Sequence, residues 1–208
     1  MAKYKTIYSD PPWAERGGGK IKRGADRHYP LMSTKDIKAL PVGDIADENC
    51  HLYLWVTNNF LKDGLEVMEA WGFRYVTMIT WMKDRISLGQ YFRGLTEHCL
   101  FGVKGRLPYR YDQDGKRLQG KTGFVAPRRE HSAKPKKMRE MIELVSHEPR
   151  IELFSRSNAE GWDHLGNAQD GKDIREQLQA MIDGRDVAVN GGEIPPGKGQ
   201  EKDLFEES

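Results

Sequence analysis

The stretch "IYSDPPWAERGGGK", residues 7–20, joins a short apolar strand to an acid, two prolines and a tryptophan, and then to three glycines among basic residues. Each proline fixes its own φ angle, lacks a backbone N–H and restricts the residue before it, so two in succession form a stiff corner. Asp10 and Trp13 are therefore held rigidly at the end of a strand, where the ligand sites of buried sheets are commonly built. On its own, an Asp-Pro-Pro sequence is equally compatible with a structural turn beside a buried aromatic residue.

Further β-type runs predict a sheet around this corner. Together with residues 5–10, they lie at 51–57, 74–82, 97–105, 123–127 and 150–156. Most of these runs are continuously apolar, which is typical of strands that are buried on both faces. Helical patterns lie between them, at 33–40, 58–71 and 134–146. The alternation of strands and helices predicts an α/β fold with a doubly wound sheet.

Composition restricts the class of protein. The chain has 208 residues, of which 38% are hydrophobic, and this is enough for one well-packed domain. Cys50 and Cys99 each lie inside an apolar run, so we expect neither a disulfide framework nor a zinc site. No apolar run approaches the ~18 residues that span a bilayer, and the N-terminal sequence lacks the apolar core of a signal peptide. We therefore expect a cytoplasmic protein.

The net charge of +2 conceals an uneven distribution. Residues 170–208 hold five Lys and Arg against ten Asp and Glu, a charge of −5, so residues 1–169 carry +7. Residues 104–139 alone hold twelve basic and three acidic side chains, a charge of +9. Such a density predicts a surface that binds a polyanion, although runs of this kind more commonly form a solvated charged face.

The C-terminal part of the chain differs from the rest. Residues 173–184 can form one amphipathic helix, but residues 185–208 are rich in glycine, proline and charge and have little to bury. We expect one domain over residues 1–169, followed in residues 170–208 by a short helix and a mobile acidic tail.

From Ile7 to Asn167 the sequence resembles the catalytic domain of the messenger-RNA adenosine N6-methyltransferase family, with its bacterial and phage relatives. The matching segments occur in family order and at near-family spacing: DPPW (10–13), HYPLMS (28–33), LYLWVT (52–57), AWGFRYV (70–76), ITWMK (79–83), EHCLFGVKG (97–105), HSAKP (131–135), IELFSR (151–156) and WDHLGN (162–167). The resemblance implies a Rossmann-like S-adenosylmethionine-dependent methyltransferase sheet. Its motif order is circularly permuted, with the catalytic corner before the cofactor strand.

The resemblance also implies a chemical purpose for the corner. An adenine amine is a poor nucleophile because its lone pair is delocalised into the ring. If the Asp10 carboxylate and the Pro11 carbonyl each accept one N–H, the nitrogen is drawn toward a tetrahedral geometry and its lone pair is aimed at the methyl donor. Pro12 stiffens the corner, and Trp13 offers a face on which the base can stack.

Other roles follow from the resemblance, position by position. Tyr29 matches an aromatic residue in the loop that closes over the substrate adenine, and Lys134 matches the lysine that pairs with the carboxylate of the cofactor. Without the resemblance, a lysine at this place would more commonly be solvated. Arg156 and Asn167 match the pair that holds the cofactor ribose, and Asn158 matches a polar cofactor contact. Asp10 borders the cofactor as well.

The segment that follows the corner has a separate expected role. Its glycines, 17–19, lack the spacing and the Ser or Thr of a phosphate-binding loop. They more plausibly allow the segment to close over substrate, with its basic residues near phosphates. These residues are Arg16, Lys20, Lys22, Arg23 and Arg27.

The sequence departs from the family in two places. Ser155 stands where relatives have glycine and would crowd the cofactor unless the backbone is shifted, and Ala168 cannot supply a hydrogen bond that relatives draw from glutamine. We therefore expect a modest affinity for the cofactor. Glu97 and His98 match an acidic residue and a histidine of the family, but His98 alternates within an apolar strand, and we assign it no catalytic role.

The substrate of such a site is a nucleic acid whose adenine is single-stranded or flipped out of a duplex. The chain shows no RNA-binding finger or long N-terminal region like those of the large eukaryotic relatives, so we expect DNA rather than RNA. An RNA methyltransferase and a catalytically silent nucleic-acid-binding relative are the alternatives. The sequence leaves open whether the protein forms a homodimer or works with a partner subunit.

Overall fold

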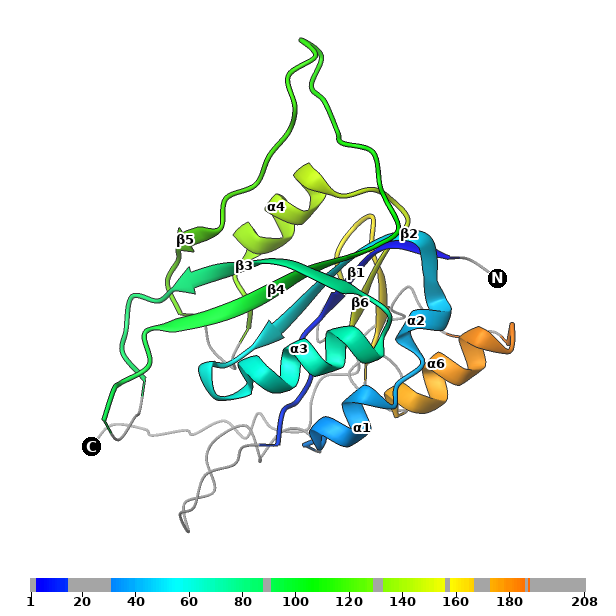
Figure 1. Ribbon diagram of the computed structural model, residues 1–208, viewed down its shortest axis with the longest axis horizontal. Coiled ribbons are helices and arrows are strands. Elements are labelled where there is room, and N and C mark those ends of the chain that lie inside the picture. Colours follow the sequence, from blue (N-terminus) through cyan, green and yellow to red (C-terminus); the bar gives the residue numbers. More distant parts are fainter. Residues whose placement is uncertain are drawn as a thin grey trace, which may run out of the picture.

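The computed structural model describes residues 3–14, 31–87, 91–128, 133–155, 158–166, 173–185 and 187. Within these residues one seven-stranded sheet has the order β5-β3-β4-β2-β1-β6-β7 (Figure 1). The strands are β1 (Tyr4–Ser9), β2 (Ala46–Val56), β3 (Arg74–Met82), β4 (Thr96–Lys104), β5 (Gly123–Val125), β6 (Arg150–Leu153) and β7 (Asp163–Leu165). The helices are α1 (Thr34–Lys38), α2 (Val42–Ile45), the 3-10 turn η2 (Asn58–Phe60), α3 (Leu61–Ala70), α4 (Lys136–Val145) and α6 (Ile174–Ile182).

Helices cover both faces of this sheet. Ile7 and Tyr8 are neighbours in β1, and their side chains therefore point to opposite faces. Ile7 belongs to an apolar cluster with Val67 of α3 and Leu178 of α6, whereas Tyr8 belongs to a second cluster with Ile142 of α4. In Figure 1, α1, α2, α3 and α6 accordingly lie on one face and α4 on the other. Because both faces are buried, the central strands need the continuous apolar runs that the sequence shows.

Strand β1 lies between β2 and β6, where the two halves of the sheet meet. It pairs in parallel with β2, where Ser9 is opposite Leu54, and with β6, where Ser9 is opposite Leu153. The connections to β2 and β6 run over opposite faces of the sheet, so the carboxyl end of β1 is a topological switch point. Ligands of α/β sheets bind at such points, and Asp10 directly follows Ser9.

The predicted α/β fold is confirmed, and its strands agree closely with the sequence patterns. The run at 74–82 is β3 residue for residue, and the other predicted runs each contain or overlap a strand. The short elements α2 and β7 were not predicted, because four or three residues carry too little periodicity to be recognised.

The predicted C-terminal helix is α6, and it packs on the main core. Ile174 and Leu178 are buried in the cluster that contains Ile7. The predicted acidic tail, 185–208, lies outside the described residues except for 185 and 187.

Candidate active site

The corner is fixed by backbone hydrogen bonds as well as by its prolines. The Trp13 N–H donates to the Pro11 carbonyl at 2.9 Å, which closes a tight turn around Pro12. The Met32 N–H donates to the Pro12 carbonyl at 2.8 Å, and the Ala14 N–H donates to the Met32 carbonyl at 3.0 Å. Segment 15–30 therefore leaves and rejoins the described chain at the corner itself. A carbonyl oxygen has two lone pairs, so Pro11 retains capacity for a second donor.

Trp13 packs into the protein. Its indole Nε1–H donates to the Trp55 carbonyl at 2.9 Å, and its ring stacks on Phe60 with centroids 5.3 Å apart. The side chain is only 8% exposed. One face of the indole is thus occupied, and a base could contact only the small remaining surface.

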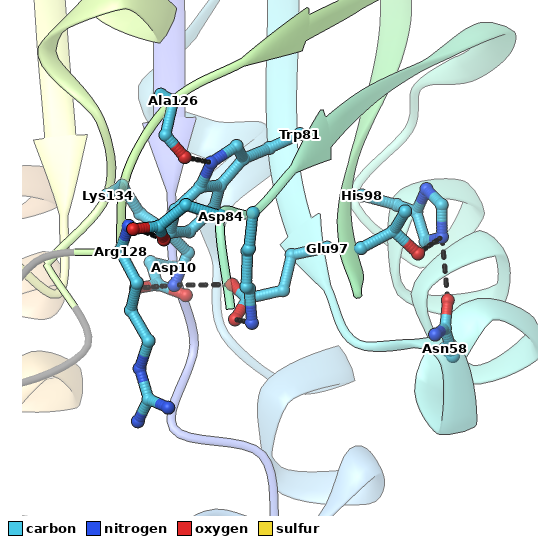
Figure 2. A network of polar contacts seen from close by, with 11 residues as sticks. Asp10, Asn58, Trp81, Asp84, Glu97, His98, Ala126, Arg128 and Lys134 are labelled. Carbon is cyan, nitrogen blue, oxygen red and sulfur yellow. Dashed lines mark hydrogen bonds and ion pairs between the residues drawn. The ribbon is translucent and has the colours of Figure 1, made fainter. Parts of the chain in front are cut away.

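Beside the corner, four charged side chains of alternating sign form a chain of ion pairs (Figure 2). Lys134 Nζ lies 2.6 Å from Asp10 Oδ2 and 3.5 Å from Glu97 Oε2. Glu97 Oε1 in turn accepts a hydrogen bond from Lys83. These ion pairs join the end of β1, the start of β4, the end of β3 and the loop before α4. The Lys134 ammonium also lies over the Trp55 ring, 5.2 Å from its centroid.

The charge state of each side chain in these ion pairs depends on its neighbours, because the group is largely withdrawn from water. Side-chain exposure is 8% for Lys83, 14% for Lys134 and 20% for Glu97. Burial alone would raise the pKa of Glu97, but the Lys134 ammonium and the hydrogen bond from Lys83 outweigh it, and the pKa is held below its usual value. Glu97 is therefore an ionised bridge between two lysines and not a proton donor.

The His98 side chain points away from these ion pairs, as expected for the residue that follows Glu97 in a strand (Figure 2). Its ring is hydrogen-bonded to Asn58 Oδ1 at 2.6 Å and to Thr80 Oγ1 at 3.1 Å. Partial burial lowers the pKa of His98. These contacts describe a histidine held by structural partners.

The carboxyl end of β6, next to β1 in the sheet, carries a second sharp turn. Phe154 has a φ of 62°, in the left-handed region that few side chains adopt, and this ends the strand. Ser155 is 2% exposed, and its hydroxyl is hydrogen-bonded to His164 Nδ1 at 2.9 Å, so the serine that replaces a family glycine turns into the protein. A Cβ added at Gly166 would lie 2.6 Å from the Ser155 carbonyl oxygen, so the two backbones meet with no room for a side chain.

The structure brings Asp10, Pro11, Pro12, Trp13 and Lys134 together, although Lys134 is 124 positions from Asp10. Asn158 is exposed after β6. The remaining predicted site residues lie outside the described residues: Arg16, Lys20, Lys22, Arg23, Arg27, Tyr29, Arg156 and Asn167.

Sequence reasoning missed the pairing of Lys83 with Glu97. The signal was a carboxylate inside an otherwise apolar strand, since a buried charge requires a partner. The sequence does not show which lysine supplies it.

The structure divides the basic segment 104–139 between two ends of the sheet. Lys104 is opposite Cys50 in the sheet, far along β2 from the end that borders the corner, and the connection 105–122 forms an arm that projects from there (Figure 1). In this arm Arg110 donates to the carbonyl oxygens of Glu143 and Ser146 at the end of α4. Only the later part of the segment, which contains Lys134, approaches the corner.

An α/β sheet with an Asp-Pro-Pro-Trp corner at its switch point, facing a buried lysine, defines a Rossmann-like methyltransferase that acts on an amine. Comparison with known proteins gives the family. Residues 4–168 match the MT-A70 family. The Type II methyltransferase M.MunI of a Mycoplasma species is 30% identical over 203 residues, which covers 87% of this chain and 84% of that protein. The human N(6)-adenosine-methyltransferase catalytic subunit METTL3 is 32% identical over 186 residues, or 82% of this chain and 29% of that protein.

The chain belongs to the MT-A70 family. The predicted resemblance and the predicted class of enzyme, an adenine N6-methyltransferase, are thereby confirmed. The chain spans most of the mycoplasma relative but less than a third of the plant and animal relatives, such as the 26% of the Arabidopsis thaliana N(6)-adenosine-methyltransferase MT-A70-like. No helix within the described ranges is long and apolar enough to cross a membrane.

Proposed function

We propose that the protein transfers a methyl group from S-adenosylmethionine to the N6 amine of adenine in DNA. One observation carries the proposal: the carboxylate of Asp10 and the carbonyl of Pro11 share a rigid corner at the switch point of the sheet, with Lys134 Nζ 2.6 Å from the carboxylate. No cysteine, serine or histidine nucleophile is needed for this chemistry, since the amine itself attacks.

The described residues fit the proposed cofactor. The Ser9 hydroxyl, at the carboxyl end of β1, is buried and has no hydrogen-bond partner within the described part of the chain. The Ser155 side chain, at the carboxyl end of β6, is 2% exposed and hydrogen-bonded to His164, so it is turned into the protein. Lys134 supplies an ammonium suited to a carboxylate. When bound, S-adenosylmethionine supplies an electrophilic methyl group on a sulfonium.

The protein contributes orientation and electrostatic acceptance. In our proposal Asp10 and Pro11 each accept one N–H of the adenine amine, and the ion pair with Lys134 fixes the orientation of the carboxylate. Because both acceptors are held before substrate arrives, no reorganisation is needed when the amine becomes positively charged. Trp13 borders the base with the small surface that Phe60 leaves uncovered.

Further residues complete the proposed site. We propose that Tyr29 closes over the adenine, that Arg156 and Asn167 hold the cofactor ribose and that Asn158 contacts the cofactor. Phosphate contacts are proposed for the basic residues of segment 15–30, both ends of which lie at the corner. These residues are Arg16, Lys20, Lys22, Arg23 and Arg27.

The share of each relative's length that this chain covers favours DNA over RNA. The chain spans 84% of the compact Type II methyltransferase and only 29% of the human N(6)-adenosine-methyltransferase, whose name specifies the ribonucleoside.

The proposal is tested by incubating the purified protein with labelled S-adenosylmethionine and matched single- and double-stranded DNA and RNA, then digesting each to nucleosides. We expect N6-methyldeoxyadenosine from the wild type and none from Asp10→Asn, which keeps the size of the side chain but removes its charge. N6-methyladenosine would redirect the proposal to RNA. If no substrate is methylated and calorimetry detects no S-adenosylmethionine binding, the protein is a silent nucleic-acid-binding relative. Binding without methylation would indicate a missing partner subunit.

A further inference from the structure

The connection between β3 and β4, of which 83–87 and 91–95 are described, leaves the sheet at the same end as the corner, because His98 is opposite Val56 and Ser9 is opposite Leu54 in β2 (Figure 1). It is called the hairpin below. Its base is closed by the Lys83 N–H, which donates to the Leu95 carbonyl at 2.9 Å, and by the Ser87 N–H, which donates to the Gly94 carbonyl at 2.6 Å. Arg93 adds a hydrogen bond from its Nε–H to the Ser87 carbonyl at 3.1 Å. Tyr91 and Phe92, called the tip below, are therefore carried on a paired stem.

Two adjacent aromatic side chains stand almost fully in solvent at this tip. Tyr91 is 94% exposed and Phe92 is 92% exposed. Among the described large hydrophobic residues the next most exposed is Val125, at 67%. A single exposed apolar side chain needs no explanation, but a consecutive pair on a closed stem suggests a surface that becomes covered.

The loop that carries the aromatic pair is basic. Besides Lys83, which is buried against Glu97, residues 83–96 contain Arg85 and Arg93 against one further acidic residue, Asp84. Arg85 is 84% exposed and lies 3.8 Å from Asp84, and the backbone N–H of Arg128 donates to the Asp84 carboxylate at 2.7 Å, which brings another exposed arginine to the loop. Asp84 thus brings Arg85 and Arg128 together at the base of the stem.

The stem is linked to the proposed catalytic carboxylate through two intermediate side chains. Lys83 at its base holds Glu97, Glu97 contacts Lys134, and Lys134 contacts Asp10 (Figure 2). These buried ion pairs leave little freedom between the corner and the stem, so a strand whose adenine occupies the corner would pass the hairpin with its neighbouring nucleotides.

We propose that the hairpin is a nucleic-acid docking element, in which Tyr91 and Phe92 stack on bases that flank the target adenine and Arg85 and Arg93 contact the adjoining phosphates. Aromatic rings with nearby cations are the usual means of holding a single strand without reading its sequence, because every base offers a stacking face. The inference rests on the proposed function, since it names how the substrate of that site is held.

Charge favours a nucleic acid over a second copy of this chain as the occupant. A two-fold contact through the hairpin would place Arg85 and Arg93 near the same residues of the partner, and like charges brought together in an interface are unfavourable. A polyanion neutralises both arginines.

The test measures binding of a fluorescently labelled single-stranded oligodeoxynucleotide, with one adenine among thymines, by anisotropy. Tyr91→Ala combined with Phe92→Ala is expected to raise Kd about 5- to 150-fold for each stacked base, which corresponds to ~1–3 kcal/mol. Tyr91→Trp with Phe92→Trp should retain the affinity. Tyr111→Ala, which removes a 57% exposed tyrosine on the far arm, is the matched control and should leave Kd unchanged.

Two further measurements separate the outcomes. A 5-iodouracil next to the adenine should crosslink on irradiation to residue 91 or 92, as identified by mass spectrometry. An unchanged Kd in the double alanine variant, in a protein that still methylates DNA, overturns the inference and leaves the proposed function intact. So does a dimer in sedimentation velocity that the double alanine variant converts to monomer while its Kd is unchanged. The proposed function itself fails if the wild-type protein transfers no methyl group, whatever Kd the anisotropy measurement gives.

Discussion

Replacement of Glu97 by glutamine should destabilise the protein, because Glu97 is a largely buried carboxylate between two lysines. The carboxylate lies 3.5 Å from Lys134 Nζ and is hydrogen-bonded to Lys83. Glutamine keeps the shape but leaves two largely buried ammonium groups to share one carboxylate, that of Asp10. At an effective dielectric constant of about 20, two unit charges 3.5 Å apart interact by ~5 kcal/mol. The desolvation of Glu97 offsets part of this, and buried pairs that lose one partner typically cost about 3–5 kcal/mol.

We therefore expect Glu97→Gln to lower the free energy of unfolding by about 3 kcal/mol, measured by urea denaturation followed by circular dichroism. Glu148→Gln is the matched control, because Glu148 also forms an ion pair, with Arg150 at 2.7 Å, but is 67% exposed. An exposed pair contributes about 0–1 kcal/mol. Lys83→Met should restore part of the loss in the Glu97→Gln background, since it removes one of the two uncompensated charges. If Glu97→Gln costs no more than Glu148→Gln, the ion-pair chain does not support the site.

The ion pairs of Glu97 also make the free energy of unfolding depend on pH. Because the pKa of Glu97 in the folded protein lies below its ordinary value of 4.5, the folded state binds fewer protons than the unfolded state in that range. The stabilisation is present above pH 4.5 and is lost as pH falls through the folded pKa. The difference between wild type and Glu97→Gln should shrink accordingly in acid, and a constant difference down to pH 3 would contradict this origin.

Three further predictions concern Gly166, His51 and the two cysteines. Gly166→Ala should cost about 1–3 kcal/mol, because its Cβ would lie 2.6 Å from the backbone oxygen of Ser155, whereas Gly120→Ala, whose Cβ would meet a side chain at 3.4 Å, should be nearly neutral in urea denaturation. Burial lowers the pKa of His51 to about 4, so the unfolded state binds the proton first and stability should fall from pH 6.5 toward pH 4 by at most ~1.4 kcal/mol per unit. In His51→Gln, urea midpoints over that range should depend less steeply on pH. Both cysteines are buried, so native protein should react with Ellman's reagent at pH 8 far more slowly than unfolded protein.

Much of the fold was predictable because its signals are local. The run at 74–82 combines β-branched and aromatic residues over the length of a strand, and β3 occupies it residue for residue. The stiffness of the corner was likewise visible, since Pro11 and Pro12 restrict the backbone in any context. The antiparallel placement of β4 between β2 and β3 was not predicted, because strand order depends on contacts between segments that lie far apart in the sequence.

The site was only partly predictable for the same reason. The identity of Lys134 as a site residue came from resemblance, whereas its partners, Asp10 and Glu97, lie 124 and 37 positions away. The packing of Trp13 was also hidden, because the stacking of its ring on Phe60 depends on the tertiary position of η2. From sequence alone, a tryptophan is equally suited to stack on a base or to pack in the core. The tertiary contacts decide how much of the indole remains accessible.

The alternation of charge beside the corner explains why these residues form a unit. Asp10, Lys134, Glu97 and Lys83 sum to zero, so the group can be withdrawn from water at a lower cost than any member alone. Removing the inner members, Lys134 or Glu97, leaves like charges adjacent, whereas removing Asp10 at the end leaves Glu97 to neutralise one lysine. A Lys134→Ala variant should therefore lose stability as well as cofactor affinity, and its affinity has to be measured where the variant is still folded. Asp10→Asn should remain closer to wild type in stability while it loses methyl transfer, and that contrast between fold and activity assigns the chemistry to the corner.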